Sequence, residues 1–105
     1  MHKAGDVVLA WVQFTDTAEQ KKRPALVLFE ELGNVVVAGI TSNKAMKGIV
    51  IGPKDGLMKE SVIKTNYIFT LTAQAIEKKL CDLPPAKRRE VHAALMEKLS
   101  GLIQA

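Results

Sequence analysis

The sequence predicts one small domain, mainly β with α, in which a strongly curved antiparallel sheet or barrel carries a single packed helix. Short apolar segments separated by turn residues fill the first two-thirds of the chain, whereas helical periodicity is confined to its end. The 105 residues suffice for one hydrophobic core but not for two. We therefore expect residues 1–105 to form a single domain.

The first two strands are predicted from composition and from the position of a proline. Residues 6–14, DVVLAWVQF, are rich in branched and aromatic side chains and form the first strand. Residues 15–23 are almost entirely polar and are expected to connect it to the next strand. The second strand is predicted over residues 24–31, with Pro24 at its first position, where a missing N–H is tolerated.

Three further strands complete the predicted sheet. Gly33-Asn34 supplies a turn into the third strand, residues 35–42. A short fourth strand is expected over residues 47–52. Residues 61–71, SVIKTNYIFTL, read as one long strand or two short ones.

Helices are predicted only towards the end of the chain. Residues 72–80 suggest a short helix that Thr72 could cap. Residues 84–103 predict the one long helix, because prolines open it and apolar residues recur at helical spacing, namely Val91, Ala94, Leu95, Leu99 and Leu102.

The predicted strands carry more apolar residues than one buried face requires. In residues 7–12, VVLAWV, both alternating sets of side chains are apolar, and residues 25–29 and 34–40 repeat the pattern. A strand that is apolar on both faces needs cover on both, and one helix can hide only part of a small sheet. We therefore expect a homodimer, in which a second copy supplies the remaining cover.

Composition and charge narrow the class of protein. Hydrophobic residues make up 48% of the chain and charged residues 25%, which is typical of soluble globular proteins. The net charge of +4 and the pI near 9.3 favour a polyanionic partner. A single cysteine, Cys81, excludes an internal disulfide and fits a reducing compartment. No targeting or spanning segment is apparent, so we expect a cytoplasmic protein without a membrane partner.

Common catalytic motifs are absent from the sequence. One cysteine and two distant histidines, His2 and His92, do not supply a zinc ligand set. Dinucleotide-binding, Walker A and nucleophile-elbow motifs are also missing. We therefore expect neither a metal nor a cofactor.

Polar residues at the predicted strand ends could bind a phosphate. A hairpin through Gly33-Asn34 would place residue 26 opposite residue 41, so that Arg23 and Thr41-Ser42 share one open end of the sheet. A guanidinium and hydroxyl groups at one rim suit a phosphate, and Lys64 would add a positive group if its strand returns beside them. The alternatives are a polar strand end at Thr41-Ser42 and a solvated turn at residues 21–23.

Several segments, in order, resemble the MazF/PemK family of type II toxin–antitoxin toxins. Four motifs recur in that family, namely a glycine-acid-hydrophobic start, an Arg-Pro-hydrophobic strand, a Thr-Ser strand end and a late basic strand. The matching segments here are GDVVLAWVQFTD (5–16), KKRPALVLF (21–29), AGITSN (38–43) and SVIKTNYIFTL (61–71). The C-terminal helix is also similar, so the resemblance covers nearly the whole chain.

The resemblance implies a fold and an activity. Members of the family are small SH3-like antiparallel barrels with a C-terminal helix, which dimerise and cleave single-stranded RNA without a metal. The catalytic arginine and threonine of the family fall on Arg23 and Thr41. The resemblance also implies an antitoxin partner with an acidic tail.

Further residues are assigned to RNA binding by the same resemblance. The first loop of the family falls on residues 15–22. The RNA-binding residues implied here are Thr15, Lys21, Lys22, Ser42 and Lys64, with Lys44 and Lys47 as additions on a neighbouring loop. Some members use an arginine and an aspartate in the late strand, where this chain has Lys64 and Asn66.

Three alternatives to ribonuclease activity stay open at this point. The first is a poison of gyrase built on the same fold. The second is a family member that binds RNA or partners without cutting. The third is an SH3-like interaction module, against which the aromatic content of 5% counts, because recognition of proline-rich ligands needs an aromatic groove.

Overall fold

A computed structural model describes residues 1–12, 21–43 and 45–104. Its strands are β1 (Asp6–Val12), β2 (Lys21–Glu31), β3 (Asn34–Thr41), β4 (Ile49–Ile51), β5 (Ser61–Thr72) and β6 (Ile76–Asp82). One α-helix, α1 (Pro85–Leu99), follows them, and three short 3₁₀ turns are η1 (Pro53–Asp55), η2 (Ala73–Ala75) and η3 (Ser100–Leu102). None of the helices in these ranges is long and apolar enough to cross a membrane.

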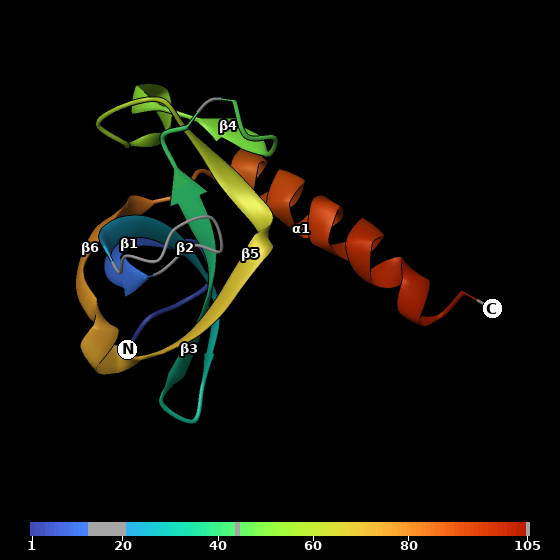
Figure 1. The fold of residues 1–105 in the computed structure, drawn as a ribbon, viewed down its shortest axis with the longest axis horizontal. Coiled ribbons are helices and arrows are strands. Elements are labelled where there is room, and N and C mark those ends of the chain that lie inside the picture. Colours follow the sequence, from blue (N-terminus) through green and yellow to red (C-terminus); the bar gives the residue numbers. More distant parts are fainter. Residues whose placement is uncertain (13–20, 44, 105) are drawn as a thin grey trace.

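The six strands form one strongly curved antiparallel sheet with α1 beside it (Figure 1). Their order is β4-β5-β3-β2-β1-β6, so β4 and β6 are the two edges of the described sheet. Each neighbouring pair is antiparallel. This architecture confirms the predicted fold class of a small barrel-like sheet with a C-terminal helix.

Each face of the sheet carries its own hydrophobic core. We call the cluster inside the curve the inner core, and it contains Val8, Ala10, Val12, Ala25, Val27, Val35 and Val37. On the other face lies the helix-side core, which contains Val7, Leu26, Ala38, Ile40, Ile51, Leu57, Ile63, Leu83 and Val91. Curvature therefore explains why the strands are apolar on both faces, and the chain itself provides much of the cover that we expected from a second copy.

The β2–β3 hairpin turns one residue earlier than the sequence predicted. Glu31 pairs with Asn34, and the two residues between them, Leu32 and Gly33, both have positive φ, at 52° and 82°. Such a two-residue turn matches the twist of the flanking strands. Leu26 consequently pairs with Ala38, and the predicted pairing of residue 26 with residue 41 is wrong.

The basic run lies inside a strand, which corrects the prediction that it ends a polar connection. Lys21, Lys22 and Arg23 pair with the last three residues of β1. Pro24 is therefore interior to β2 and pairs with Leu9, whereas the ladder between β2 and β3 begins one residue later, at Ala25. The proline is tolerated because its missing N–H falls outside that second ladder. Residues 13 and 14 of the predicted first strand lie outside the described residues.

The prediction of a helix over residues 72–80 is wrong. Residues 76–82 form β6, which pairs antiparallel with β1 and gives the backbone groups on that side of β1 their partners. Lys79 of β6 also lies 3.3 Å from the buried Asp6 carboxylate of β1. Tertiary pairing thus overrides local helix propensity in this segment.

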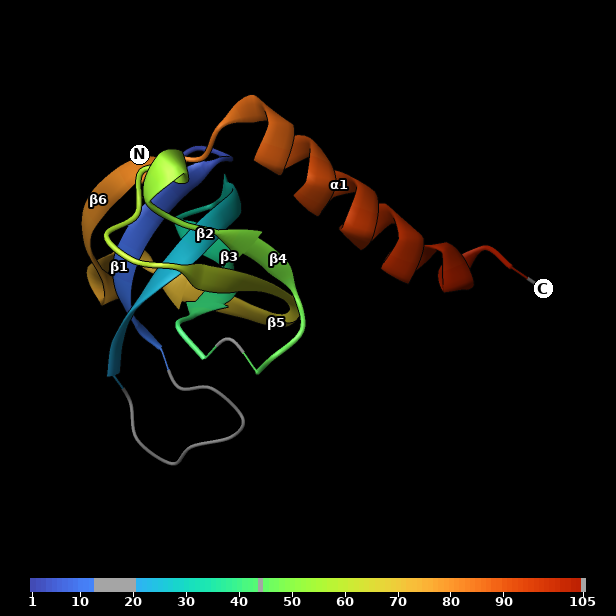
Figure 2. The ribbon, with the colours of Figure 1, turned by 90° about the horizontal axis from the view of Figure 1, so that it is seen from above.

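Helix α1 packs beside the sheet, and its C-terminal end extends beyond the sheet (Figure 2). Val91 is its buried residue, and Leu95 packs against the helix-side core. The predicted helix over residues 84–103 therefore exists, but it ends at Leu99 and continues as the η3 turn. Large apolar side chains remain exposed on the second half of α1 and in the residues that follow it, namely Met96, Leu99, Leu102 and Ile103.

Candidate functional site

Strand pairing brings Arg23, Thr41 and Lys64 to one face of the sheet, the face of the inner core. Ala25 pairs with Gly39, and Gly39 pairs with Lys64. Extending this register by two residues, beyond the end of the β2–β3 ladder, sets Arg23 level with Thr41. Alternate residues of a strand share a face, so Arg23 lies on the face of Ala25 and Thr41 on the face of Gly39. We call Arg23, Thr41 and Lys64 the rim site.

Small residues lie between the members of the rim site. One row of paired positions runs through Val8, Ala25, Gly39 and Lys64. In the next row Ala10 pairs with Arg23 and Thr41 pairs with Val62, whereas Arg23 and Thr41 lie just beyond the end of the β2–β3 ladder. Ala25 and Gly39 carry little or no side chain, and we call these two residues the low floor of the rim site.

Thr41 is held in place by the chain that follows it. The side chain is only 6% exposed, and its Oγ1 accepts the backbone N–H of Asn43 at 3.1 Å. The Oδ1 of Asn43 in turn accepts the backbone N–H of Ala45 at 3.1 Å. With Oγ1 already accepting one hydrogen bond, the hydroxyl of Thr41 keeps its own proton to donate.

Lys64 is a buried cation with no carboxylate beside it in the described part of the chain. The residue is 9% exposed, and its Nζ donates to the backbone oxygen of Lys47 at 2.6 Å. The same Nζ lies 5.4 Å from the centroid of the Tyr67 ring. A buried charge without a counter-charge lowers stability, so an ammonium kept in this position is suited to an anion supplied from outside.

Arg23 enters the rim site from an interior position of β2. It pairs with Ala10 of the inner core, the residue is half-buried, and its Nε atom is shielded from solvent. A guanidinium on such a rigid strand can present two parallel donors to one phosphate, a geometry that an ammonium lacks.

The remaining residues assigned to RNA binding are not gathered at the rim site. Lys22 pairs with Trp11 on the opposite face, where its Nζ lies 5.5 Å from the indole centroid and 3.1 Å from a Glu77 oxygen. Lys21 is exposed and alternates onto the face of Arg23, and Ser42 is exposed at the bend after β3. Thr15 and Lys44 lie outside the described residues.

Sequence reasoning did not identify Tyr67 or the Lys47 carbonyl as neighbours of Lys64. A lysine followed three residues later by a tyrosine is visible in the sequence. The signal is weak, however, because strand alternation alone would turn residues 64 and 67 to opposite faces. A register shift in β5 between the pairs Ala38–Ile68 and Gly39–Lys64 removes that difference.

The chain has two further kinds of reactive group, namely side chains that can bind metals and a single thiol. Within residues 1–12, 21–43 and 45–104, no three His, Cys, Asp or Glu side chains are close enough to hold a metal ion. Burial raises the pKa of the Cys81 thiol, and the Asp82 and Asp55 charges raise it further. The thiol therefore favours its protonated form, which is the less nucleophilic one.

A comparison with protein families finds a model that matches most of the chain. The model of a family described as PemK-like, MazF-like toxin of type II toxin-antitoxin system matches residues 3–99. No curated protein sequence matches the chain significantly.

Solved structures share the fold. The chain is similar to the Mycobacterium tuberculosis toxin MazF-mt6 at 22% identity, covering 90% of this chain and 96% of that one, with a TM-score of 0.73. MazF (Form-I) from Deinococcus radiodurans matches at 23% identity over 94% and 96%, with a TM-score of 0.71. An endoribonuclease in complex with its cognate antitoxin, from a mycobacterial species, matches at 19% identity over 95% and 96%, with a TM-score of 0.73.

Replacing Lys64 by methionine should leave the fold at least as stable as before. Methionine fills similar space without a buried charge, so we expect the free energy of unfolding in urea to rise by about 1–2 kcal/mol. Lys47→Met is the matched control, because its backbone oxygen is what contacts Lys64 and its own side chain is exposed. It should change stability by less than about 0.5 kcal/mol. A loss above about 1 kcal/mol in Lys64→Met would identify Lys64 as a structural cation instead.

Proposed function

Because the chain belongs to the PemK-like, MazF-like family of type II toxin–antitoxin toxins, we propose that it is an endoribonuclease whose catalytic centre is the rim site. One observation carries the proposal. Lys64 is buried without a carboxylate among the described residues, opposite Gly39 and on the face that Arg23 and Thr41 share. Three donors around a low floor suit a phosphate in a flexible single strand of RNA.

The proposed reaction uses the nucleophile that RNA itself carries. The ribose 2′-oxygen attacks the adjacent phosphorus, the bond from phosphorus to the 5′-oxygen breaks, and the products are a cyclic phosphate and a 5′-hydroxyl end. Arg23 stabilises the charge that builds on the phosphoryl oxygens, and Lys64 adds a second positive group. The Thr41 hydroxyl positions the phosphate or the 2′-hydroxyl. No metal or cofactor takes part.

Residues around the rim site are proposed to bind the flanking RNA. Lys21, Ser42 and Thr15 keep the roles implied by the family resemblance. Lys22 also keeps its implied role, although Glu77 already compensates part of its charge. A gyrase poison or a non-cleaving binder on the same fold would not require Arg23 and Thr41 at one rim, so both alternatives are tested by variants at these positions.

Arg23→Ala should abolish cleavage while the protein stays folded. Losing one preorganised charge-stabilising donor lowers kcat by about 100- to 1000-fold. Arg23→Lys should also be poor, since a point charge does not replace the guanidinium fork. The measurement is the release of 5′-hydroxyl fragments from a mixed single-stranded RNA in EDTA. Lys78→Ala, an exposed cation of β6, is the control. Full activity of Arg23→Ala, or no cleavage by the wild type, would exclude this mechanism.

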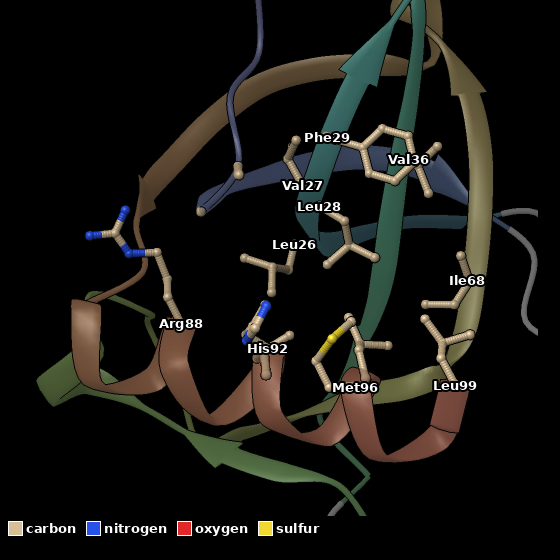
Figure 3. A pocket seen from close by; sticks show the side chains of 14 residues that line it. Leu26, Val27, Leu28, Phe29, Val36, Ile68, Arg88, His92, Met96 and Leu99 are labelled. Carbon is tan, nitrogen blue, oxygen red and sulfur yellow. The ribbon is translucent and has the colours of Figure 1, made fainter. Parts of the chain in front are cut away.

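We further propose that the protein is a homodimer, and that the second copy covers a groove between α1 and the sheet. This groove is apolar and has a volume of about 520 Å³ (Figure 3). Met96 and Leu99 from the helix face Leu28 and Ile68 across it. The groove continues onto the exposed outer half of α1, where side chains of a second copy would find apolar partners.

Leu99→Asp should convert the dimer to a monomer. A carboxylate placed in an apolar contact loses its hydration without a partner, so association is disfavoured. Light scattering at micromolar concentration should report about twice the chain mass of 11.5 kDa for the wild type and the single mass for the variant. Met58→Asp, at a fully exposed apolar position outside the groove, should remain dimeric. A monomeric wild type would contradict the proposal.

The third part of the proposal is an antitoxin partner whose acidic tail occupies the rim site. Carboxylates and phosphates bind the same arginine and lysine groups, so one basic site can accept either ligand. A tail that fills the site would prevent RNA from entering it. Inhibition would then be direct competition.

An acidic tail peptide should therefore displace a labelled, uncleavable RNA from the protein. Both ligands should bind more weakly at higher salt, because exposed charges are screened over a Debye length of about 8 Å at physiological ionic strength. Lys21→Ala/Lys22→Ala should raise KM more than it lowers kcat. The titration is run at two salt concentrations. Persistence of bound RNA when the peptide saturates the protein would show that the two ligands occupy different sites.

A further inference from the structure

Both segments that flank Lys64 in the sheet carry a glycine. Gly39 of β3 pairs with it directly. On the other side, β4 pairs with β5 through Ile49 and Ile63, and Gly48 is the residue immediately before Ile49. Gly39 therefore places no side chain beside Lys64 on β3.

Gly48 also allows an unusually close approach of the chain to β5. A Cβ atom at this position would overlap the backbone oxygen of Ile63 and the Cγ1 atom of Val62. Any other residue would have to push the segment away from β5. Because the segment lies so close, the backbone oxygen of Lys47 is within 2.6 Å of the Lys64 Nζ.

The second contact of the ammonium depends on the register shift in β5. Between the pairs Gly39–Lys64 and Ala38–Ile68, β5 has more residues than β3, so the strand bulges there. Tyr67 falls at the end of this bulge, packs against the inner core, and carries its ring to within 5.4 Å of the Lys64 Nζ. A cation in this position is attracted to the face of the ring.

From these contacts we propose that Gly48 and Tyr67 are positioning residues that hold the Lys64 ammonium ready for the RNA phosphate. The inference rests on the proposed ribonuclease function. Its physical basis is the absence of a formal negative charge in the holding groups. A carboxylate would fix the ammonium but would neutralise it and repel a phosphate, whereas a carbonyl dipole and an aromatic face hold it with its full charge available.

The test compares Tyr67→Leu with Tyr67→Phe. Phenylalanine keeps the ring face and loses only the hydroxyl, whereas leucine keeps apolar bulk and loses the ring face. Tyr67→Leu should raise KM for single-stranded RNA by about 3- to 30-fold with kcat nearly unchanged. Tyr67→Phe should keep the wild-type KM. A tyrosine that served only to fill the core would not give a raised KM with leucine and a normal KM with phenylalanine at unchanged kcat.

Gly48→Ala tests the other contact, with Gly101→Ala as the matched control. Gly101 has open space at the Cβ position, so its substitution should leave KM unchanged. Gly48→Ala should raise KM by about tenfold, because the displaced Lys47 oxygen no longer anchors the ammonium. Should this variant fail to fold, the two Tyr67 variants decide the proposal.

A readout that needs no RNA separates this inference from the proposed function. The NMR signals of the Lys64 ε-protons should be shifted upfield by the Tyr67 ring, keep that shift in Tyr67→Phe and lose it in Tyr67→Leu. Wild-type protein that shows the shift but neither binds nor cleaves RNA would refute the ribonuclease function alone. An unchanged KM in both Tyr67→Leu and Gly48→Ala, or an unshifted signal in the wild type, would overturn the positioning role.

Discussion

Curvature of a single sheet is the constraint on which the rest of this structure depends. Because β1 to β3 bend around the inner core, alternate side chains of the same strands enter two separate cores, as Val7 and Val8 do. The bend also brings the second half of β5 over the inner core through Tyr67, Phe69 and Leu71. Small side chains at Ala25 and Gly39 then leave the low floor that the rim site surrounds.

The rim site is polar because it lies at the ends of strands, just beyond the apolar residues of the inner core. Thr41 closes β3, and Arg23 lies between the exposed start of β2 and the inner core. Lys64 is different, since it occupies a buried position that an apolar residue would fill more stably. That local conflict with stability is typical of residues retained for function. In the proposed role, Lys64 must keep its charge for a phosphate, and the groups that contact it, the Lys47 carbonyl and the Tyr67 ring, carry no formal charge.

Local patterns predicted most strands and the long helix, but not the features that depend on pairing. The β6 strand, IEKKLCD, has no regular apolar alternation, and only its place beside β1 makes it a strand. The hairpin register was missed because Leu32 takes a left-handed conformation that is uncommon for leucine. For the rim site, Arg23, Thr41 and Lys64 were recognisable by residue type. Gly48 and Tyr67 were not, because a register shift decides their neighbours.

The second half of α1, which extends beyond the sheet, makes the free energy of unfolding depend on what binds to it. Exposed apolar side chains there and in the η3 turn that follows, such as Leu102 at 82% exposure, gain free energy only when another surface covers them. Mass action then makes the resistance to unfolding rise with the concentration of whatever provides that cover. A few isolated chains would unfold and be degraded more readily than the same chains in quantity. The free energy of unfolding of a protein with such an overhang is therefore a property of its concentration and of its partners, and not of the single chain alone.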